Sequence, residues 1–124
     1  MEYLVIENLF DKWNNALKSG IPQKVLALYD QKAILLPTIS DRVRHNHPEI
    51  KEYFEAFLLK KPSGKVNESN IRLFGDIAIN SGVYTFTFGD RSSLTARFTF
   101  VYRKANQKWL IVEHHSSIMP EQLT

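Results

Sequence analysis

Three polar side chains near the carboxyl end of the sequence, Arg97, Glu113 and His115, are spaced so that one face of a strand pair can hold them together. A guanidinium, a carboxylate and an imidazole at cross-strand spacing form a site in which Arg97 holds an anion and a base moves a proton. Glu113 and His115 are therefore the candidate catalytic residues. A buried ion-pair network, or part of an oligomer interface, would need the same residue types, because an unpaired buried charge is costly.

The length of the loop between the two strands decides which of these side chains are neighbours. If residues 105–107 form a three-residue loop, Arg97 lies opposite His115. A two-residue or four-residue loop would instead pair Arg97 with His114. The polar group on one face is thus a prediction that depends on the turn.

Metal and thiolate chemistry are not expected in this chain, and no cofactor is predicted. The sequence contains no cysteine, which removes thiolate nucleophiles, disulfides and zinc-finger sites. His114 and His115 are adjacent, so in a strand they point to opposite faces and cannot bind one metal ion. His45 and His47 have no evident third ligand. We therefore predict no metal site.

The first half of the chain has the periodicity of helices. Apolar residues recur at offsets of three and four over residues 2–19, and Gly20 favours the end of that helix. A short second helix is predicted over Pro22–Tyr29, and a third runs from 48 to about 60, where Pro62 follows it. These helices must bury their apolar stripes against a sheet.

The second half changes to the alternation of strands. We predict four consecutive strands at about 66–74, 77–88, 93–104 and 108–118, preceded by a short edge strand over residues 33–36. Their short connections require antiparallel pairing, so the fold class is α+β, with the helices on one face of the sheet.

The predicted strands are long enough that the sheet must bend around the first helix. Gly82, inside the second long strand, suits a bulge or bend at that point. A bent sheet closed by helices leaves a cone whose open end is a pocket. Tyr29, Tyr53 and Tyr84 are first of all core aromatics, but their hydroxyl groups could serve as hydrogen-bond donors in that pocket.

Length and composition exclude several classes of protein. The 124 residues suffice for a single domain over 1–124, and 44% hydrophobic residues are ordinary for a globular fold. No apolar run approaches the ~18 residues of a membrane span, and no secretory signal is visible, so a cytoplasmic location is expected. A net charge of +3 with scattered basic residues does not indicate nucleic-acid binding.

The order of these elements and several local motifs resemble the nuclear transport factor two-like superfamily. The resemblance covers nearly the whole chain and is closest to the association (hub) domain of calcium/calmodulin-dependent protein kinase II. Its landmarks include the end of the first helix near Trp13, the segments Ala27–Asp30 and Ala96–Tyr102, and above all Lys108–Ser117 followed by Met119-Pro120.

The resemblance implies a conical α+β barrel with helices in the concave face of a strongly bent antiparallel sheet. It also implies self-association through the outer face of the sheet, as a homodimer or larger ring. Arg44 falls in a segment that this fold places near the cone, which makes it a candidate anion contact. The strand positions that carry the hub's anion-binding arginines hold Thr85, Phe100 and Ser116 here.

Three functions remain open at this point. The leading hypothesis is a homo-oligomeric, hub-like protein whose cone binds a small and perhaps anionic molecule, without asserted catalysis. Its candidate ligand-binding residues are Arg97, Glu113, His115, Arg44, Tyr84 and Tyr53. The alternatives are an isomerase, dehydratase or hydrolase that uses the same pocket, and an oligomerisation scaffold with a filled cone.

Overall fold

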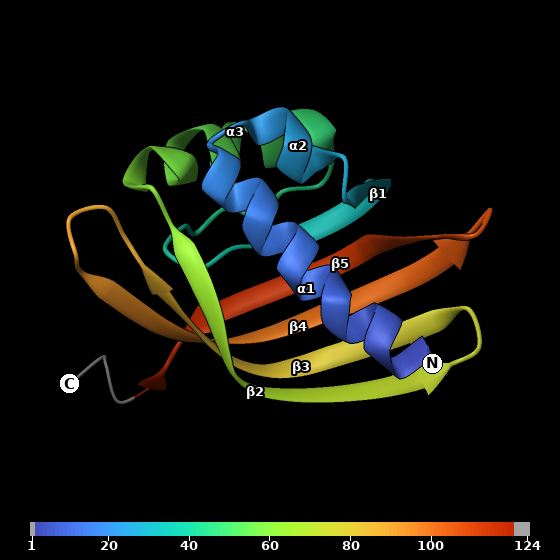
Figure 1. Ribbon diagram of the computed structural model, residues 1–124. Helices are drawn as coiled ribbons and strands as arrows, with labels where there is room; N and C mark the ends of the chain where they lie inside the picture. The colour runs from blue at the N-terminus through green and yellow to red at the C-terminus, as the bar shows by residue number, and fades with distance from the viewer. Residues whose placement is uncertain (1, 121–124) are drawn as a thin grey trace.

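Helix α1 (Glu2–Ser19) lies across the concave side of a curved sheet in the computed structural model, which describes residues 2–120 (Figure 1). Its buried residues are Ile6, Phe10, Trp13, Ala16 and Leu17. Their spacing of three and four makes one apolar stripe, which packs on the sheet. The helix ends at Gly20, whose φ of 73° lies in the left-handed region that favours glycine. The prediction for residues 2–19 is confirmed.

Helix α2 (Pro22–Leu26) is shorter than the predicted helix over Pro22–Tyr29, because Tyr29 is already the first residue of strand β1 (Tyr29–Leu36). Strand β1 pairs with the last strand in parallel, starting at Tyr29 opposite Ile111. The sheet is therefore mixed, and the prediction of a purely antiparallel sheet was wrong for this edge strand.

Helix α3 (His47–Phe57) continues into the short 3-10 helix η1 (Leu58–Lys60), close to the predicted helix from 48 to about 60. Its N-terminus is capped by Asn46, whose side-chain oxygen accepts from the Glu49 amide at 3.0 Å. The helix lies beside α2 and packs against β1 (Figure 1).

Four long strands follow as an antiparallel meander, as predicted. They are β2 (Ser63–Phe74), β3 (Ile77–Thr87), β4 (Ser93–Ala105) and β5 (Lys108–Ile118), and the order in the sheet is β1-β5-β4-β3-β2. The sheet is strongly curved but does not close into a barrel (Figure 1).

Strands β2 and β3 approach each other closely at Gly82. A Cβ atom on Gly82 would lie 1.9 Å from the carbonyl oxygen of Glu68, so no side chain fits there. The irregularity itself lies in β2 between Val66 and Glu68, which face Tyr84 and Val83. Sequence analysis predicted a bulge or bend at Gly82; the extra residue lies on its partner strand.

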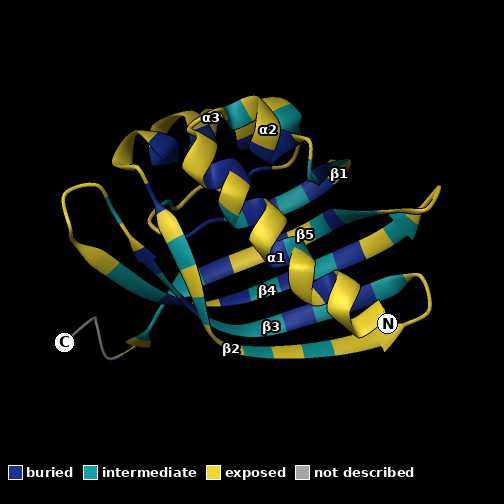
Figure 2. Cartoon of the chain, in the orientation of Figure 1, coloured by how far each residue is buried: buried dark blue, intermediate teal, exposed yellow. Residues whose placement is uncertain are grey.

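The two faces of the sheet differ in what covers them. Buried and more exposed residues alternate along β3 and β4 (Figure 2). On β4, Phe98, Phe100 and Tyr102 are buried in the core, whereas the intervening positions point to the outer face. None of the helices of residues 2–120 covers that outer face (Figure 1). No helix within this range is long and apolar enough to cross a membrane.

Candidate functional site

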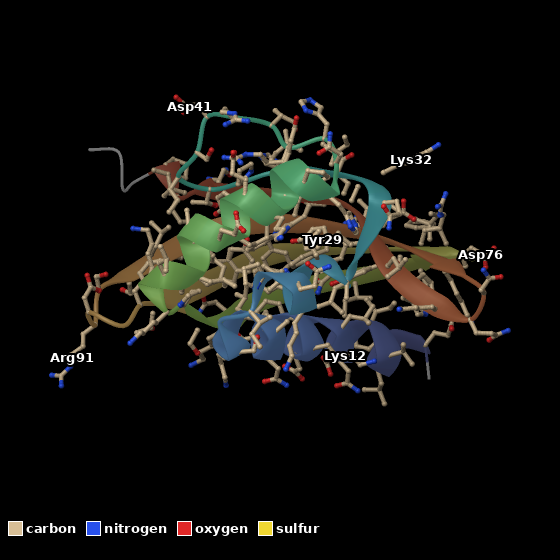
Figure 3. All side chains as sticks on the ribbon, turned by 90° about the horizontal axis from the view of Figure 1, so that it is seen from above. Lys12, Tyr29, Lys32, Asp41, Asp76 and Arg91 are labelled. Atoms are coloured by element: carbon tan, nitrogen blue, oxygen red, sulfur yellow. The ribbon has the colours of Figure 1, made fainter. Side chains whose placement is uncertain are left out.

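A chain of buried hydrogen bonds passes through the interior of the cone. It connects six side chains in the order Trp13, Tyr29, His114, Tyr84, Ser116 and Thr38. Tyr29, near its inner end, lies in the middle of the molecule, whereas Asp76 and Arg91 lie at the periphery (Figure 3). The fold brings together residues from α1, from three strands and from the turn after β1.

The inner end of this network fixes the direction of its first bond. The indole N–H of Trp13 can only donate, and it donates to the Tyr29 hydroxyl at 3.1 Å. The Tyr29 oxygen lies 2.8 Å from Nδ1 of His114. The Tyr29 hydroxyl can donate to Nδ1 or accept from it, and the tautomer of His114 decides which.

The outer end of the network determines the tautomer of His114. The Tyr84 hydroxyl donates to Ser116 Oγ at 2.7 Å, and it lies 3.1 Å from His114 Nε2. With its hydrogen directed at Ser116, Tyr84 can only accept from the ring, so Nε2 carries the imidazole hydrogen. Ser116 then contacts Thr38 Oγ1, and either hydroxyl can be the donor.

His114 is neutral in this environment. Burial, and to a smaller extent the neighbouring His115, lowers its pKa from 6.5 to about 3. The His114 ring stacks on the Phe100 ring with the two centroids 4.0 Å apart. Its plane makes an angle of 87° with the plane of the Trp13 indole. Burial also raises the pKa of Tyr29 and Tyr84, so the whole network is uncharged near neutral pH.

The space left inside the cone is very small. A cavity of about 10 Å³ is bordered by Thr38, Tyr53, Tyr84, His114 and Ser116 together with apolar side chains. This volume matches the ~10–15 Å³ that a single water molecule requires. No Lys, Arg, Asp or Glu of the described residues borders it, so the cavity is lined by hydroxyl groups, an imidazole and hydrocarbon.

The predicted polar group of Arg97, Glu113 and His115 lies on the outer face of the sheet, and all three side chains are exposed. The predicted pairing of Arg97 with His115 was wrong, and so was the alternative with His114: Arg97 lies opposite Ser117. The three residues share a face as predicted, but they do not border the interior cavity.

The turn explains the wrong pairing. Ala105 pairs with Lys108, so the loop has two residues, Asn106 and Gln107, both with positive φ. Such a turn matches the twist of the two strands. A register shift between Val101 and Tyr102 then inserts an extra residue in β5 and moves every later pair.

The other predicted ligand residues divide between a structural role and the cavity. Arg44 is buried, and its guanidinium donates to the carbonyl oxygens of Arg42 and Glu49, to the Ser40 hydroxyl and to the Glu52 carboxylate. Four of its five N–H groups are therefore used to hold the loop against α3.

Tyr53 and Tyr84 both border the interior cavity. The Tyr53 hydroxyl donates to the carbonyl oxygen of Thr38 at 3.1 Å, and burial raises the pKa of Tyr53. This bond holds the turn after β1 against α3. Of the six predicted ligand residues, the structure therefore brings these two to the cavity.

Sequence analysis missed the two polar residues that border the cavity from β5. His114 was considered as a metal ligand and as an alternative partner of Arg97, and Ser116 as a strand position that carries an arginine in the hub. Positions two apart on a strand share a face, so the alternation of exposed Glu113 and His115 with His114 and Ser116 could have placed the second pair inside. Within residues 2–120, no three His, Cys, Asp or Glu side chains form a group that could hold a metal ion.

Comparison with known proteins gives one family. The sequence model of the calcium/calmodulin dependent protein kinase II association domain matches residues 4–120. A crystal structure from Xanthomonas campestris, named as an association domain of this kind, is 50% identical, with a TM-score of 0.89 over 94% of this chain and 86% of that one. No curated protein matches the sequence.

More distant structures agree in fold alone. A protein of unknown function with a cystatin-like fold from Nostoc punctiforme is 18% identical, with a TM-score of 0.82 over 95% of this chain and 91% of that one. A nuclear transport factor two-like protein from Pseudomonas putida is 17% identical, with a TM-score of 0.80 over 90% and 82%. The family match confirms the predicted resemblance, and these structures confirm the predicted fold class.

Proposed function

Because the chain belongs to the calcium/calmodulin dependent protein kinase II association domain family, we propose that it is a self-associating domain, at least a homodimer, in which two copies pack through the outer faces of their sheets. The observation that carries this proposal is the composition of the uncovered outer face. A lone protomer would leave that face in water.

The outer face carries a row of residues that is apolar in the middle and charged at its ends, beside a polar row of Asn70, Ser81, Thr99 and His115. One row of neighbouring residues crosses four strands in the order Arg72, Ile79, Val101 and Glu113. Ile79 and Val101 are half-buried, whereas Arg72 and Glu113 are exposed at the two ends of the row. This pattern of an apolar centre and a charged margin is typical of protein interfaces.

The charges are arranged for contact with an identical copy. A second row has the opposite order, with Glu68 at the β2 end and Arg97 nearer the β5 end. In a two-fold interface the same patch of both copies is in contact, with its order reversed in the partner. The cationic end of a row in one copy can therefore face an anionic end of a row in the other. The ion pairs formed within residues 2–120 involve neither Arg97 nor Glu113, which leaves both charges available for a partner.

The enzymatic alternative has less support. Its proposed bases, Glu113 and His115, are exposed on the outer face, and no carboxylate of the described residues borders the cavity. The family assignment and the outer face together favour association without catalysis.

Light scattering tests the proposal directly. The wild-type protein should have at least twice the mass of one chain at micromolar concentration. Val101→Asp, which buries a carboxylate at the centre of the interface, should lower the mass to that of a monomer. The control Val5→Asp, at a side chain that is 43% exposed on α1, should leave the mass unchanged. A monomeric wild-type protein, or a Val101→Asp variant that still associates fully, would contradict the proposal.

A further inference from the structure

Strand β2 forms one edge of the sheet, and most of that edge is uncovered. In the strand order β1-β5-β4-β3-β2 its neighbour is β3, and no other strand of residues 2–120 lies beside its outer side (Figure 1). An edge strand presents backbone N–H and C=O groups that can pair with a strand of another chain. At 12 residues, β2 offers a long edge of this kind.

The structure closes the opposite edge of the sheet, but only the start of the β2 edge. On β1, the backbone of Leu35 exchanges two hydrogen bonds with that of Arg44, at 2.9 and 2.8 Å. On β2, the side chain of Asn14 accepts from the Gly64 amide at 2.7 Å and donates to the Gly64 carbonyl oxygen at 3.0 Å. The bulge of β2 follows directly. Beyond it, no loop or side chain of the described residues bonds to the outer backbone of this strand.

The uncapped part of β2, residues 68–74, is regular and partly apolar. It pairs with β3 residue by residue, from Glu68 opposite Val83 to Phe74 opposite Ile77. Leu73 is 42% exposed and Phe74 is 59% exposed. The segment contains neither proline nor lysine, which commonly protect an edge from pairing. A regular edge without these residues is expected to associate.

The sequence of this segment is complementary to itself in the antiparallel direction. Glu68, Asn70 and Arg72 point to the outer face of the sheet. Ser69 and Ile71 point to the inner face. If two copies pair with Asn70 opposite Asn70, each Glu68 lies opposite Arg72 of the other copy, and each Ser69 lies opposite Ile71. Every side chain then shares a face with the residue opposite it.

Both charged side chains are available for this pairing. Neither Glu68 nor Arg72 forms an ion pair within residues 2–120. The Glu68 carboxylate accepts from Nδ2 of Asn70 at 3.0 Å, and Nη2 of Arg72 donates to Ser81 Oγ at 3.1 Å. Each group retains further hydrogen-bonding positions for a cross-strand partner. Opposite charges on directly opposed strand positions stabilise a strand pair, whereas like charges destabilise it.

We propose that β2 pairs antiparallel with β2 of a second copy, in the register centred on Asn70, so that the two sheets become one continuous sheet. This contact goes beyond the proposed packing of outer faces and does not rest on it, because it uses the edge of the sheet. The edge contact alone is weak, since its ion pairs are exposed and its area is small. Copies already joined through their outer faces still have free edges, so edge contacts link them into larger assemblies.

A disulfide tests the register directly, because the sequence contains no cysteine. Ser69→Cys and Ile71→Cys proteins are prepared separately, mixed at high concentration and oxidised. Directly opposed positions lie within the span of a disulfide, whereas two copies of either position are displaced along the strands beyond that span. The mixture should therefore form at least about tenfold more disulfide-linked pairs than either variant alone, measured on a denaturing, non-reducing gel.

The position of the two thiols separates this contact from the outer-face contact. Both side chains lie on the inner face, so packing of outer faces cannot join them. The Val101→Asp variant should still form the disulfide in the mixture, although light scattering shows it as a monomer, because oxidation traps the weak edge pair. Equal yields in the mixture and in the single variants, or loss of the disulfide in Val101→Asp, would overturn the inference.

A reversal of charge tests the complementarity. Arg72→Glu, added to both cysteine variants, places like charges opposite each other and should lower the yield roughly tenfold. Glu68→Arg/Arg72→Glu makes the charges opposite again and should restore the yield to within about twofold. The control Arg91→Glu makes the same change of net charge at an exposed residue of the β3–β4 loop and should have no effect.

The proposal fails if Arg72→Glu leaves the yield unchanged, or if the double reversal does not restore it. Circular dichroism of each variant establishes that it is folded. If Ile71→Cys does not fold, Asn70→Cys replaces both thiols in Val101→Asp protein, where Asn70 lies opposite its own copy and the outer-face contact is absent. The same charge reversals then decide the outcome.

Discussion

The neutral, buried His114 makes a quantitative prediction about stability in acid. The pKa of this ring is about 3 in the folded protein and 6.5 in the unfolded chain. Below pH 6.5 the unfolded chain binds a proton that the folded protein does not, so the free energy of unfolding falls with pH. The stability that the neutral His114 ring contributes is fully present above pH 6.5 and is lost progressively as the pH falls to about 3.

The expected loss is large relative to the stability of a small domain. Each pH unit corresponds to about 1.4 kcal/mol, so the interval from 6.5 to about 3 corresponds to roughly 5 kcal/mol. Between pH 6.5 and about pH 4 the share of His114 is roughly 3 kcal/mol. Domains of this kind are stable by about 5–15 kcal/mol, so the effect is measurable well before acid unfolding is complete.

The assay is urea unfolding at several pH values, at fixed ionic strength and fixed protein concentration, because self-association couples stability to concentration. His114→Gln removes the titrating group, and His115→Gln is the matched control on the exposed neighbour. The carboxyl groups titrate in all three proteins, so they cancel in the comparison.

We expect the stability of His114→Gln to fall less steeply with acid than that of the wild type, by roughly 3 kcal/mol down to about pH 4. His115→Gln should follow the wild-type slope closely. Identical slopes for the wild type and His114→Gln would show that the ring is not held neutral in the core, and the directed network derived from it would fail as well.

Two further substitutions test the packing of the fold, each by urea unfolding. Gly82→Ala should destabilise the protein by about 2 kcal/mol or more, because the added Cβ would meet the Glu68 carbonyl oxygen. In the control Gly89→Ala the added Cβ meets only the flexible Lys61 side chain and should cost little, so equal effects would contradict this reasoning. Tyr102→Phe removes a buried hydroxyl that has no hydrogen-bond partner among the described residues, so it should leave stability unchanged or raise it by up to about 1 kcal/mol. Tyr84→Phe breaks the hydrogen bonds to His114 and Ser116 and should lower stability by about 1–3 kcal/mol. A marked loss of stability in Tyr102→Phe would show that its hydroxyl does have a partner.

The fold could be predicted from the sequence because each long element has a clear period. The stripe of α1 and the alternation of the four meander strands are local patterns, and their boundaries agree with the structure to within a few residues. Strand β1 was placed only in part, since its first residues pair with β5, which is about eighty residues away in sequence. No local sequence pattern in residues 29–32 indicates this parallel pairing.

The interior network was harder to predict than the fold. It depends on which residues of β5 face inward, and that in turn depends on the turn and on one inserted residue. Tyr84 and Tyr53 were found because aromatic residues with a polar tip are candidates for any pocket. Thr38 lies in a turn and carried no signal of its own.

The inserted residue near Val112 explains why the polar residues of β5 divide between the two faces as they do. Ile111 faces inward opposite Tyr102. With regular alternation from that point, Glu113 would also face inward, among the buried residues of the core. Burial of an unpaired carboxylate costs several kcal/mol, whereas a bulge leaves one backbone group to be satisfied elsewhere.

The bulge therefore reverses the faces beyond it, so that Glu113 and His115 point outward and His114 and Ser116 point inward. The predicted three-residue loop also placed Glu113 and His115 on the outer face. Its register differs from the observed one by two positions, and a shift of two positions leaves each side chain on the same face of the sheet. One strand thus supplies both the charged margin of the proposed interface and the neutral donors of the cone. A substitution that removed the bulge would exchange these two sets, and both association and the interior network would be lost together.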